Sequence, residues 1–162
     1  GNVIKDGKLV WQGKSSRWGN GLIGFNKDHK LVLTKETPAQ AISKGMMDAV
    51  TFGPFLIVNG KESTVFGNGG TGTHPRTIIA QRQDGIVLFI TIDGNGNKIG
   101  YRGGATYQEM IEVLKKYKAY NAANLDGGAS SILVIKNQII NNPVGYGATG
   151  ERRHPNAWVV KN

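Results

Sequence analysis

Cysteine is absent from this chain of 162 residues. Its absence excludes disulfide bonds, thiolate metal sites and cysteine nucleophiles, and it leaves the redox compartment undecided. Long apolar runs are missing too, so the sequence predicts no transmembrane segment, and no signal peptide is recognisable. A chain that begins with Gly1 is typical of a processed protein, from which a targeting segment would already have been removed.

Acidic residues are few compared with basic ones. Eleven Asp and Glu stand against twenty Lys and Arg, which gives a net charge of +9. A positive field of this kind attracts polyanions, so we expect an anionic partner. Nucleic acid, teichoic-type polymers and anionic lipids would all satisfy the charge. Helix-turn-helix, zinc-finger and aromatic ribonucleoprotein signatures are absent, which argues against nucleic acid.

Several common active-site patterns are also missing. His29, His74 and His154 are far apart in the sequence and no HExxH pattern occurs, so we expect no zinc site. No Gly-x-Ser-x-Gly nucleophile elbow is present. The glycine-rich stretch 67–72 lacks the Lys-Ser/Thr ending of a phosphate-binding P-loop.

Glycine and apolar residues are what the sequence does contain. It has 24 glycines, 39% hydrophobic residues and only 19% charged residues, a composition typical of one folded domain with many tight turns. The length fits a single domain over residues 1–162. Residues 67–74 hold four glycines and two threonines, which predicts a loop. Long loops in compact domains are often functional.

Turn residues predict two N-terminal hairpins. Asp6-Gly7 separates two apolar runs within residues 3–11, which is a strong hairpin signal. The polar turn 26–29 separates apolar pairs within residues 22–33 and predicts the second hairpin.

Capping signals predict two helices. Thr37-Pro38 is an N-cap followed by proline in the first helical position, and Gly45 should end that short helix. Thr106-Tyr107-Gln108-Glu109 is a capping box followed by apolar residues at helical spacing. The main helix should therefore cover residues 107–116.

Apolar and β-branched runs predict the remaining strands. We expect the almost continuously apolar run 86–92 to be buried on both faces and to form the central strand. A turn at Lys136-Asn137 should connect two of the later strands. The fold class is then α+β, a mixed and largely antiparallel sheet backed by two helices, with glycine-rich loops. The expected strands are 49–52, 55–58, 77–80, 86–92, 119–125, 132–135, 138–140 and 157–160.

The segment from Asn124 to Ser131 is the most informative in the chain. Asp126 follows an apolar strand and precedes two glycines, Ala129 and two serines. Successive N–H groups in such a turn can form an anion nest, to which serine hydroxyls add donors. The same residues also fit an ordinary turn in which Asp126 caps its own loop. The residues alone leave both interpretations open.

Three other segments carry candidate side chains. Arg76, in His74-Pro75-Arg76, offers a planar fork suited to phosphate, although a single Arg at a strand start is more often a surface residue. Asp93-Gly94 ends the 86–92 run and fits a simple turn. The capping box explains Glu109 without any catalytic role.

Taken in order, these motifs resemble the phosphodiester glycosidase family. The resemblance extends from about residue 50 to the end of the chain, and the hairpin within 1–11 looks like the start of that family's domain. The matching segments are His74-Pro75-Arg76-Thr77, Asp84-Gly85, Asp93-Gly94, Gly104-Ala105-Thr106 with Glu109, Asn124-Leu125-Asp126-Gly127-Gly128 with Ser130-Ser131, Ile140-Asn141-Asn142-Pro143, and Arg152 with Pro155-Asn156-Ala157.

The chain departs from the family pattern in three places. Ala129 stands where Gly or Ser is common, and Asn95 stands where Arg is frequent. The family's domain usually begins with an upstream Asn-Gly-Gly-Phe segment that this chain lacks. We therefore expect the single domain over 1–162 to lack an N-terminal segment, so that part of the pocket or an edge strand is missing or is supplied by a separate piece.

The resemblance implies hydrolysis of the glycosidic C–O bond of a sugar-1-phosphodiester, which releases the sugar and a phosphomonoester. It implies that Asp126 acts as nucleophile, base or oxocarbenium stabiliser, with Asp93 and Glu109 as candidate second carboxylates. Thr106 and Asn124 would bind the sugar. The residues that would bind phosphate or other parts of the substrate are His74, Arg76, Gly127, Gly128, Ser130 and Ser131.

The sequence requires no cofactor and assigns no metal, although Asp93 and Asp126 could share a divalent cation through oxygen ligands. A sugar-phosphate polymer of the cell envelope or an exopolysaccharide would suit the charge, which implies an extracellular or cell-envelope location.

Two alternatives remain open. A non-catalytic module could use the same basic cleft to bind an anionic cell-wall polymer, although carboxylates facing a phosphate would then only repel the ligand. A metal-dependent phosphodiesterase would break P–O instead of C–O, but its expected dense His/Asp cluster is missing.

Overall fold

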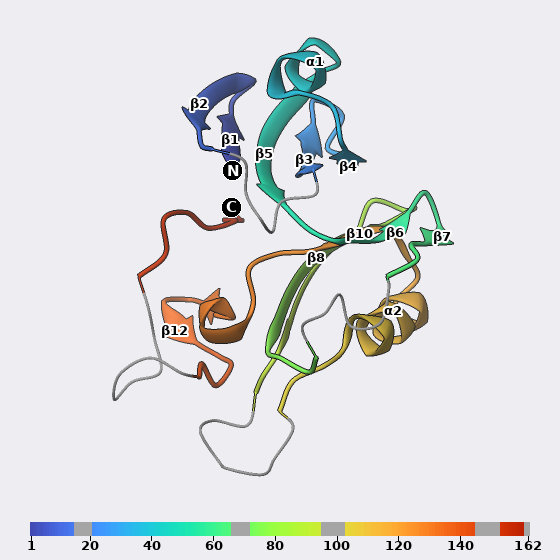
Figure 1. Ribbon diagram of the computed structural model, residues 1–162, viewed down its shortest axis with the longest axis vertical. Coiled ribbons are helices and arrows are strands. Elements are labelled where there is room, and N and C mark those ends of the chain that lie inside the picture. The colour runs from blue at the N-terminus through green and yellow to red at the C-terminus, as the bar shows by residue number, and fades with distance from the viewer. Residues whose placement is uncertain (15–20, 66–71, 95–102, 145–152, 161–162) are drawn as a thin grey trace.

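The computed structural model describes residues 1–14, 21–65, 72–94, 103–144 and 153–160. Within these residues the chain forms two five-stranded sheets, a separate hairpin, two α-helices and one short 3-10 helix (Figure 1). Their strand pairs are all antiparallel. The predicted α+β class with two helices is confirmed, and its strands are divided between two sheets. No helix in these ranges is long and apolar enough to span a membrane.

The first sheet, called the N-terminal sheet below, has the strand order β2-β1-β5-β3-β4. Both predicted hairpins form: β1 pairs with β2 through Asp6 and Gly7, whose φ angles of 51° and 70° are positive, and β3 pairs with β4. Helix α1 (Pro38–Ser43) begins after the N-cap Thr37 and is followed by Gly45, as predicted. The strands are β1 (Asn2–Lys5), β2 (Lys8–Gln12), β3 (Gly21–Asn26), β4 (Leu31–Thr34) and β5 (Met46–Phe52).

The second sheet, called the C-terminal sheet below, has the order β7-β6-β10-β8-β9. Helix α2 (Tyr107–Lys116) has the predicted bounds and packs on this sheet, and the 3-10 helix η1 (Gly128–Ser130) follows β10. In Figure 1, α2 and the β11–β12 hairpin lie on opposite sides of β8. The strands are β6 (Phe55–Val58), β7 (Lys61–Glu62), β8 (Arg76–Arg82), β9 (Val87–Ile92), β10 (Ala119–Asn124), β11 (Val134–Ile135) and β12 (Gln138–Ile139).

Two strand predictions were wrong. The 86–92 run forms β9, an edge strand of the C-terminal sheet, and not the central strand; Ile86 is 49% exposed and Phe89 is 36% exposed. A continuous apolar run is typical of a strand that is buried on both faces. Which strands pair with it, however, depends on the rest of the chain. Residues 157–160 form no strand, since no other strand pairs with them. Trp158 instead packs edge-on against Phe25, with ring centroids 5.6 Å apart.

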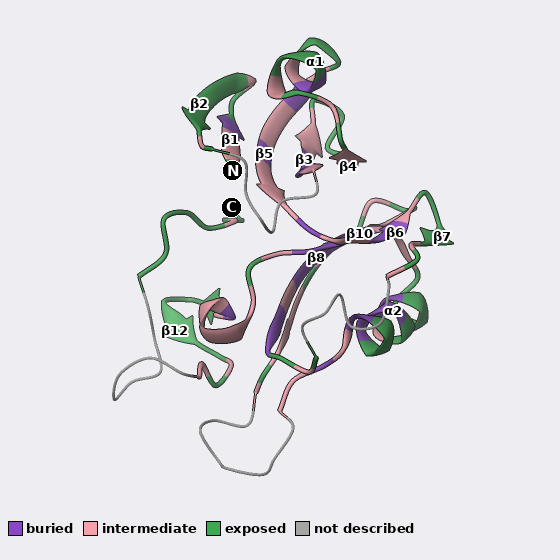
Figure 2. Ribbon diagram, in the orientation of Figure 1, coloured by how far each residue is buried: buried purple, intermediate pink, exposed green. Residues whose placement is uncertain are grey.

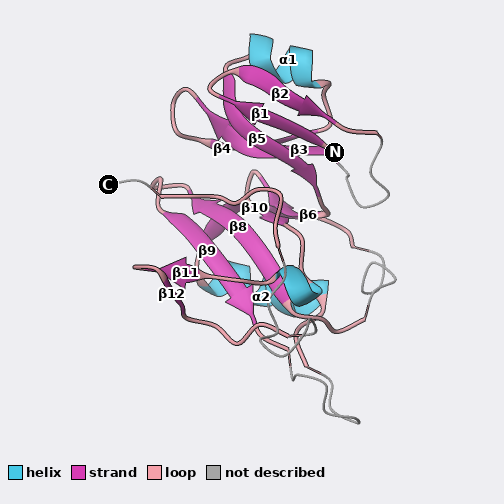
Figure 3. Cartoon of the chain, turned by 90° about the vertical axis from the view of Figure 1, so that its left-hand side faces the viewer, coloured by secondary structure: helices cyan, strands magenta, loops and turns pink. Residues whose placement is uncertain are grey.

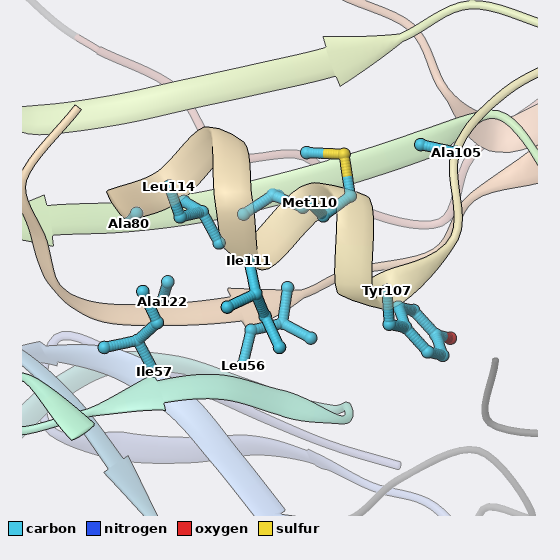
Figure 4. Close-up of a cluster of buried hydrophobic side chains, with 10 residues drawn as sticks. Leu56, Ile57, Ala80, Ala105, Tyr107, Met110, Ile111, Leu114 and Ala122 are labelled. Carbon is cyan, nitrogen blue, oxygen red and sulfur yellow. The ribbon is translucent and has the colours of Figure 1, made fainter. Parts of the chain in front are cut away.

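The side chains of β8 alternate between two cores. Ile78 and Ala80 face α2, where Met110, Ile111 and Leu114 are buried (Figure 4). Ile79 points the other way and packs with Ile23 and Leu31 of the N-terminal sheet. This period of two is the normal geometry of a strand, and burial on both faces makes β8 the most enclosed strand in the colouring of Figure 2. Burial of each large aliphatic side chain contributes about 1.5–3 kcal/mol.

Two amide side chains join the sheets at one end of β8. Gln81 is buried; its Oε1 accepts from the Leu31 N–H at 2.7 Å, and its Nε2 donates to the His29 carbonyl. The Asn121 amide donates to the Leu31 carbonyl at 3.0 Å. These contacts hold the end of β8 and the start of β10. Because the two strands are antiparallel, the residues before β8 and after β10 lie together at the opposite end of the sheet.

Candidate functional site

Pro75, directly before β8, is the point at which the candidate motifs meet. A Cβ on Gly104 would lie 2.0 Å from the carbonyl carbon of His74 and 2.5 Å from the Pro75 nitrogen. A Cβ on Gly127 would lie 2.6 Å from the Pro75 oxygen, and one on Gly94 would lie 2.6 Å from Pro75 Cγ. Such approaches leave no room for a side chain. Three segments that are distant in sequence therefore surround one proline.

Arg76 is buried, with 4% of its surface exposed. Its Nε donates to the Ala105 carbonyl and its Nη2 to the Gly72 carbonyl, each at 2.8 Å. The guanidinium also lies 4.0 Å from the centroid of the Tyr107 ring. Burial lowers the pKa of Arg76 from its ordinary value, and Tyr107 opposes this effect. Arg76 thus joins the start of β8 to the segment that leads into α2.

The chain from Gly104 to Glu109 lies beside His74. The Ala105 N–H donates to the His74 carbonyl at 2.9 Å, and the His74 side chain is exposed. The predicted capping box is present: Glu109 Oε2 accepts from the Thr106 N–H at 2.7 Å and Thr106 Oγ1 accepts from the Glu109 N–H at 3.1 Å. The backbone hydrogen bond from Thr106 lowers the pKa of Glu109. A catalytic role for Glu109 stays a prediction.

The turn of residues 126–131 is fastened to β8. Leu125 donates its N–H to the Thr77 carbonyl and Gly128 donates its N–H to the Pro75 carbonyl, each at 2.8 Å. Ser130 Oγ donates to Asp126 Oδ2 at 2.8 Å, and Asp126 is exposed. The turn therefore presents an oriented carboxylate at the surface.

The predicted anion nest is not directed at a ligand in this conformation. The N–H groups of Gly128, Ser130 and Ser131 donate to the carbonyls of Pro75, Gly127 and Gly128. Ser131 itself is buried and accepts a hydrogen bond from Thr77 Oγ1 at 3.1 Å. The phosphate roles of these residues stay predictions.

Asp93 is bound by residues that follow the β11–β12 hairpin. Asn141 Nδ2 donates to Asp93 Oδ1 at 2.8 Å and the Asn142 N–H donates to Asp93 Oδ2 at 2.9 Å. Asn141 Nδ2 also donates to the Ser131 carbonyl at 2.8 Å. The motif Asn141-Asn142-Pro143 identified this segment as part of the family pattern. It did not indicate that the Asn141 side chain binds Asp93.

Asn124 is buried at the end of β10 with 2% exposure. Its Nδ2 donates to the Gly53 carbonyl at 2.9 Å, whereas its Oδ1 has no hydrogen-bond partner among the described residues. A buried acceptor without a donor costs about 1–3 kcal/mol. A water molecule or a sugar hydroxyl could supply the missing donor, and the predicted contact of Asn124 with the sugar stays open.

The structure thus brings the motif backbones together at Pro75 while several predicted side chains have partners within the protein. A Cβ on Gly127 would lie 3.6 Å from the Cα of Arg76. Asp126 and Arg76 therefore lie at the same end of the sheet. Across the described ranges, no group of three or more His, Asp or Glu residues is arranged for a metal ion. The predicted loop 67–74 lies mostly outside the described residues, as do Asn95 and Arg152.

A groove of about 400 Å³ lies at the other end of the C-terminal sheet. Lys30, Arg82 and Tyr120 are among its lining residues, and none of the predicted site residues is. The groove is therefore separate from the Pro75 end.

A family model described as phosphodiester glycosidase matches residues 1–161. The chain belongs to the phosphodiester glycosidase family. The resemblance inferred from ordered motifs is confirmed, and the match includes the N-terminal sheet as well as the region after residue 50.

Relatives of this phosphodiester glycosidase family member are distant or longer. The SPbeta prophage-derived uncharacterized protein YomE of Bacillus subtilis strain 168 is 34% identical over 104 residues, which cover 62% of this chain and 16% of that protein. The zebrafish N-acetylglucosamine-1-phosphodiester alpha-N-acetylglucosaminidase catalytic domain, auto-inhibited by its pro-peptide, is 22% identical with a TM-score of 0.70. That match covers 88% of this chain and 50% of the zebrafish chain.

A hypothetical protein from Synechocystis has a TM-score of 0.50 and 24% identity over 69% of this chain and 21% of its own. At these identities the two structural matches show the fold alone. The chain spans about half of the zebrafish chain and a sixth of the prophage protein.

Proposed function

We propose that this protein hydrolyses the glycosidic C–O bond of a sugar-1-phosphodiester and releases the sugar and a phosphomonoester. The observation that carries the proposal is the meeting of the family's motif segments around Pro75. The exposed Asp126 carboxylate, oriented by Ser130, is the reacting group that this arrangement supports best.

The chemistry of the substrate suits a site of this kind. A phosphomonoester is an acidic leaving group, so strong general-acid assistance is less necessary than for an ordinary glycoside. Stabilisation of an oxocarbenium-like transition state by a carboxylate matters more, and Asp126 would supply it as nucleophile, base or electrostatic partner. Donors and positive charge would stabilise the departing phosphate. We assign His74, Arg76 and the turn of residues 126–131 to that task.

The second carboxylate would be Asp93 or Glu109. Glu109 lies at the first turn of α2, and Asp93 at the end of β9. Thr106 and Asn124 would bind the sugar. The net charge of +9 favours a polyanionic substrate, and we propose a sugar-phosphate polymer of the cell envelope or an exopolysaccharide, met outside the cell.

A non-catalytic module that binds anionic polymer is the second candidate. It is favoured by the carboxylates of Asp93 and Glu109, both of which accept hydrogen bonds that hold the fold together. Binding of polymer without release of sugar would support this candidate.

Hydrolysis in ¹⁸O-labelled water tests which bond breaks. Attack at the anomeric carbon should place the label on the sugar, whereas label in the phosphate would show P–O cleavage and contradict the proposal.

Asp126→Asn should abolish this hydrolysis and leave polymer binding intact or slightly tighter, because it removes a negative charge from the site. Asp84→Asn is the matched control, since Asp84 is an exposed carboxylate at the opposite end of β8. Loss of hydrolysis in both variants, or in neither, would count against a reacting role for Asp126.

A further inference from the structure

The Asn141 amide connects the end of β9 to the segment that leads from η1 into the β11–β12 hairpin. Its two N–H groups are directed at Asp93 Oδ1, which follows β9, and at the Ser131 carbonyl, which follows η1. Its Oδ1 accepts from the Leu133 N–H at 2.8 Å, at the base of the β11–β12 hairpin. Both polar atoms of this side chain are therefore used, and together they connect Asp93 to the segment of residues 131–133.

The β11–β12 hairpin buries little apolar surface. The four aliphatic residues of the hairpin and its end are exposed: Val134 54%, Ile135 51%, Ile139 38% and Ile140 52%. A two-stranded hairpin that buries so little is marginally stable by itself in water. In Figures 1 and 3 the hairpin lies beside the C-terminal sheet. The polar contacts at its base must then fix its position.

The contacts continue from Asn141 to the candidate reacting group. Ser131 donates its N–H to the Gly128 carbonyl, and its neighbour Ser130 donates its hydroxyl to Asp126 Oδ2. A shift of Ser131 would therefore move the short η1 helix and change the orientation of the Asp126 carboxylate.

We propose that Asn141 is a positioning residue for the 126–131 turn, and that Asp93 is the fixed acceptor that holds Asn141. Both Asp93 oxygens accept from N–H donors, Oδ1 from the Asn141 side chain and Oδ2 from the Asn142 backbone. Asp93 then acts through Asn141 and does not exchange a proton with the substrate, which leaves Glu109 as the second carboxylate of the proposed function. The consequence for catalysis rests on the proposed function, whereas the structural role of Asn141 does not.

Amide hydrogen exchange tests the structural role without any substrate. In Asn141→Ala the amides of Gly128 and Ser131 should exchange about tenfold faster, because the hydrogen bond to the Ser131 carbonyl is lost together with those to Asp93 and Leu133. Amides within α2 should keep their protection. Gln138→Ala is the matched control on the same hairpin, since its exposed side chain has no hydrogen bond among the described residues. Unchanged exchange of the turn in Asn141→Ala would overturn the proposal.

Asn141→Asp separates positioning from mere volume. Asp keeps the size of the side chain and an acceptor for Leu133, but it removes both donors and adds a negative charge beside Asp93. Exchange of the turn should then be at least as fast as in Asn141→Ala. Wild-type protection in Asn141→Asp would show that the donors do not matter and would contradict the proposal.

Kinetics test the catalytic consequence. Asn141→Ala and Asp93→Asn should each lower kcat about 10- to 100-fold with little change in KM, and the double variant should be no slower than either one. The acid limb of the kcat pH profile should keep its midpoint in Asp93→Asn. Additive losses, or disappearance of that limb, would identify Asp93 as an independent proton-transfer group. If wild-type protein releases no sugar, the proposed function fails, while the exchange results still decide the role of Asn141.

Discussion

Pro75 and its neighbours illustrate how single residues build the candidate site. Pro75 has no N–H group, but its carbonyl accepts from Gly128 and its ring leaves space only for glycine at position 94. A Cβ on Gly127 would collide with the same carbonyl. Gly94, Gly104 and Gly127 of this family member are therefore required for contact between segments and not only for turns. The sequence shows the glycines and Pro75, but it does not show that these residues are in contact.

Glu109 has both a capping role and a proposed catalytic role, and Glu109→Gln separates them. Gln can make the same capping hydrogen bonds, so the melting temperature at neutral pH should hardly change. If Glu109 is the second carboxylate, kcat should fall about 10²- to 10⁴-fold, as expected for the loss of an acid or base. Steady-state kinetics and thermal melts of the two proteins provide the comparison. Unchanged turnover would return Glu109 to its capping role.

The pH dependence of stability provides an independent check on the same variant. The Thr106 N–H lowers the pKa of Glu109 in the folded protein below its unfolded value of about 4.3. This stabilisation is present above the unfolded pKa and is lost as the pH falls through the folded pKa. The melting temperature of the wild type should therefore fall more steeply in acid than that of Glu109→Gln. Parallel acid limbs would contradict the hydrogen bond.

At the scale of elements, local signals predicted helix starts and hairpin turns, but they did not predict which strands lie next to each other in a sheet. The Thr106 capping box defined the start of α2, and the turn at Lys136-Asn137 adopts the predicted hairpin, in which both residues have positive φ. These signals depend on residues within one turn of the chain. The order of strands depends on the whole chain, which is why an apolar run alone does not show that β9 lies at the edge of the sheet and β10 at its centre.

Burial predicts different costs for the same substitution in β8 and directly before β9. Ile79→Ala on β8, where the side chain is fully buried between the sheets, should reduce the free energy of unfolding by about 2–5 kcal/mol. Ile86→Ala, directly before β9 and 49% exposed, should cost less than about 1 kcal/mol. Urea denaturation of the two variants measures both values. Equal costs would contradict the difference in burial between Ile79 and Ile86.

At the scale of the whole molecule, two sheets share one core while the candidate site lies at one end of the second sheet. Ile23, Leu31, Ile79 and Ala123 join the sheets, and Gln81 adds buried hydrogen bonds at the end remote from Pro75. The motif order was sufficient to predict the family. It could not predict that Arg76 would be held by carbonyls and the Tyr107 ring, because those contacts depend on the packing of α2.

The net charge gives a prediction for the molecule as a whole. Among the described residues, Lys44, Arg82 and Lys115 form salt bridges with carboxylates. Twenty Lys and Arg against eleven Asp and Glu leave an excess of positive charge that attracts a polyanion. Attraction between exposed charges is screened over about 10 Å at 0.1 M salt. KM for a sugar-phosphate polymer should therefore rise steeply with added salt while kcat changes little.

A substrate with a single phosphodiester is the control, because it presents one charge to the same field and its KM should rise much less. A KM for the polymer that is independent of salt would show that the positive charge does not recruit the substrate. The proposal that the substrate is an anionic polymer would then lose its main argument. Contacts at the Pro75 end alone would have to explain substrate recognition.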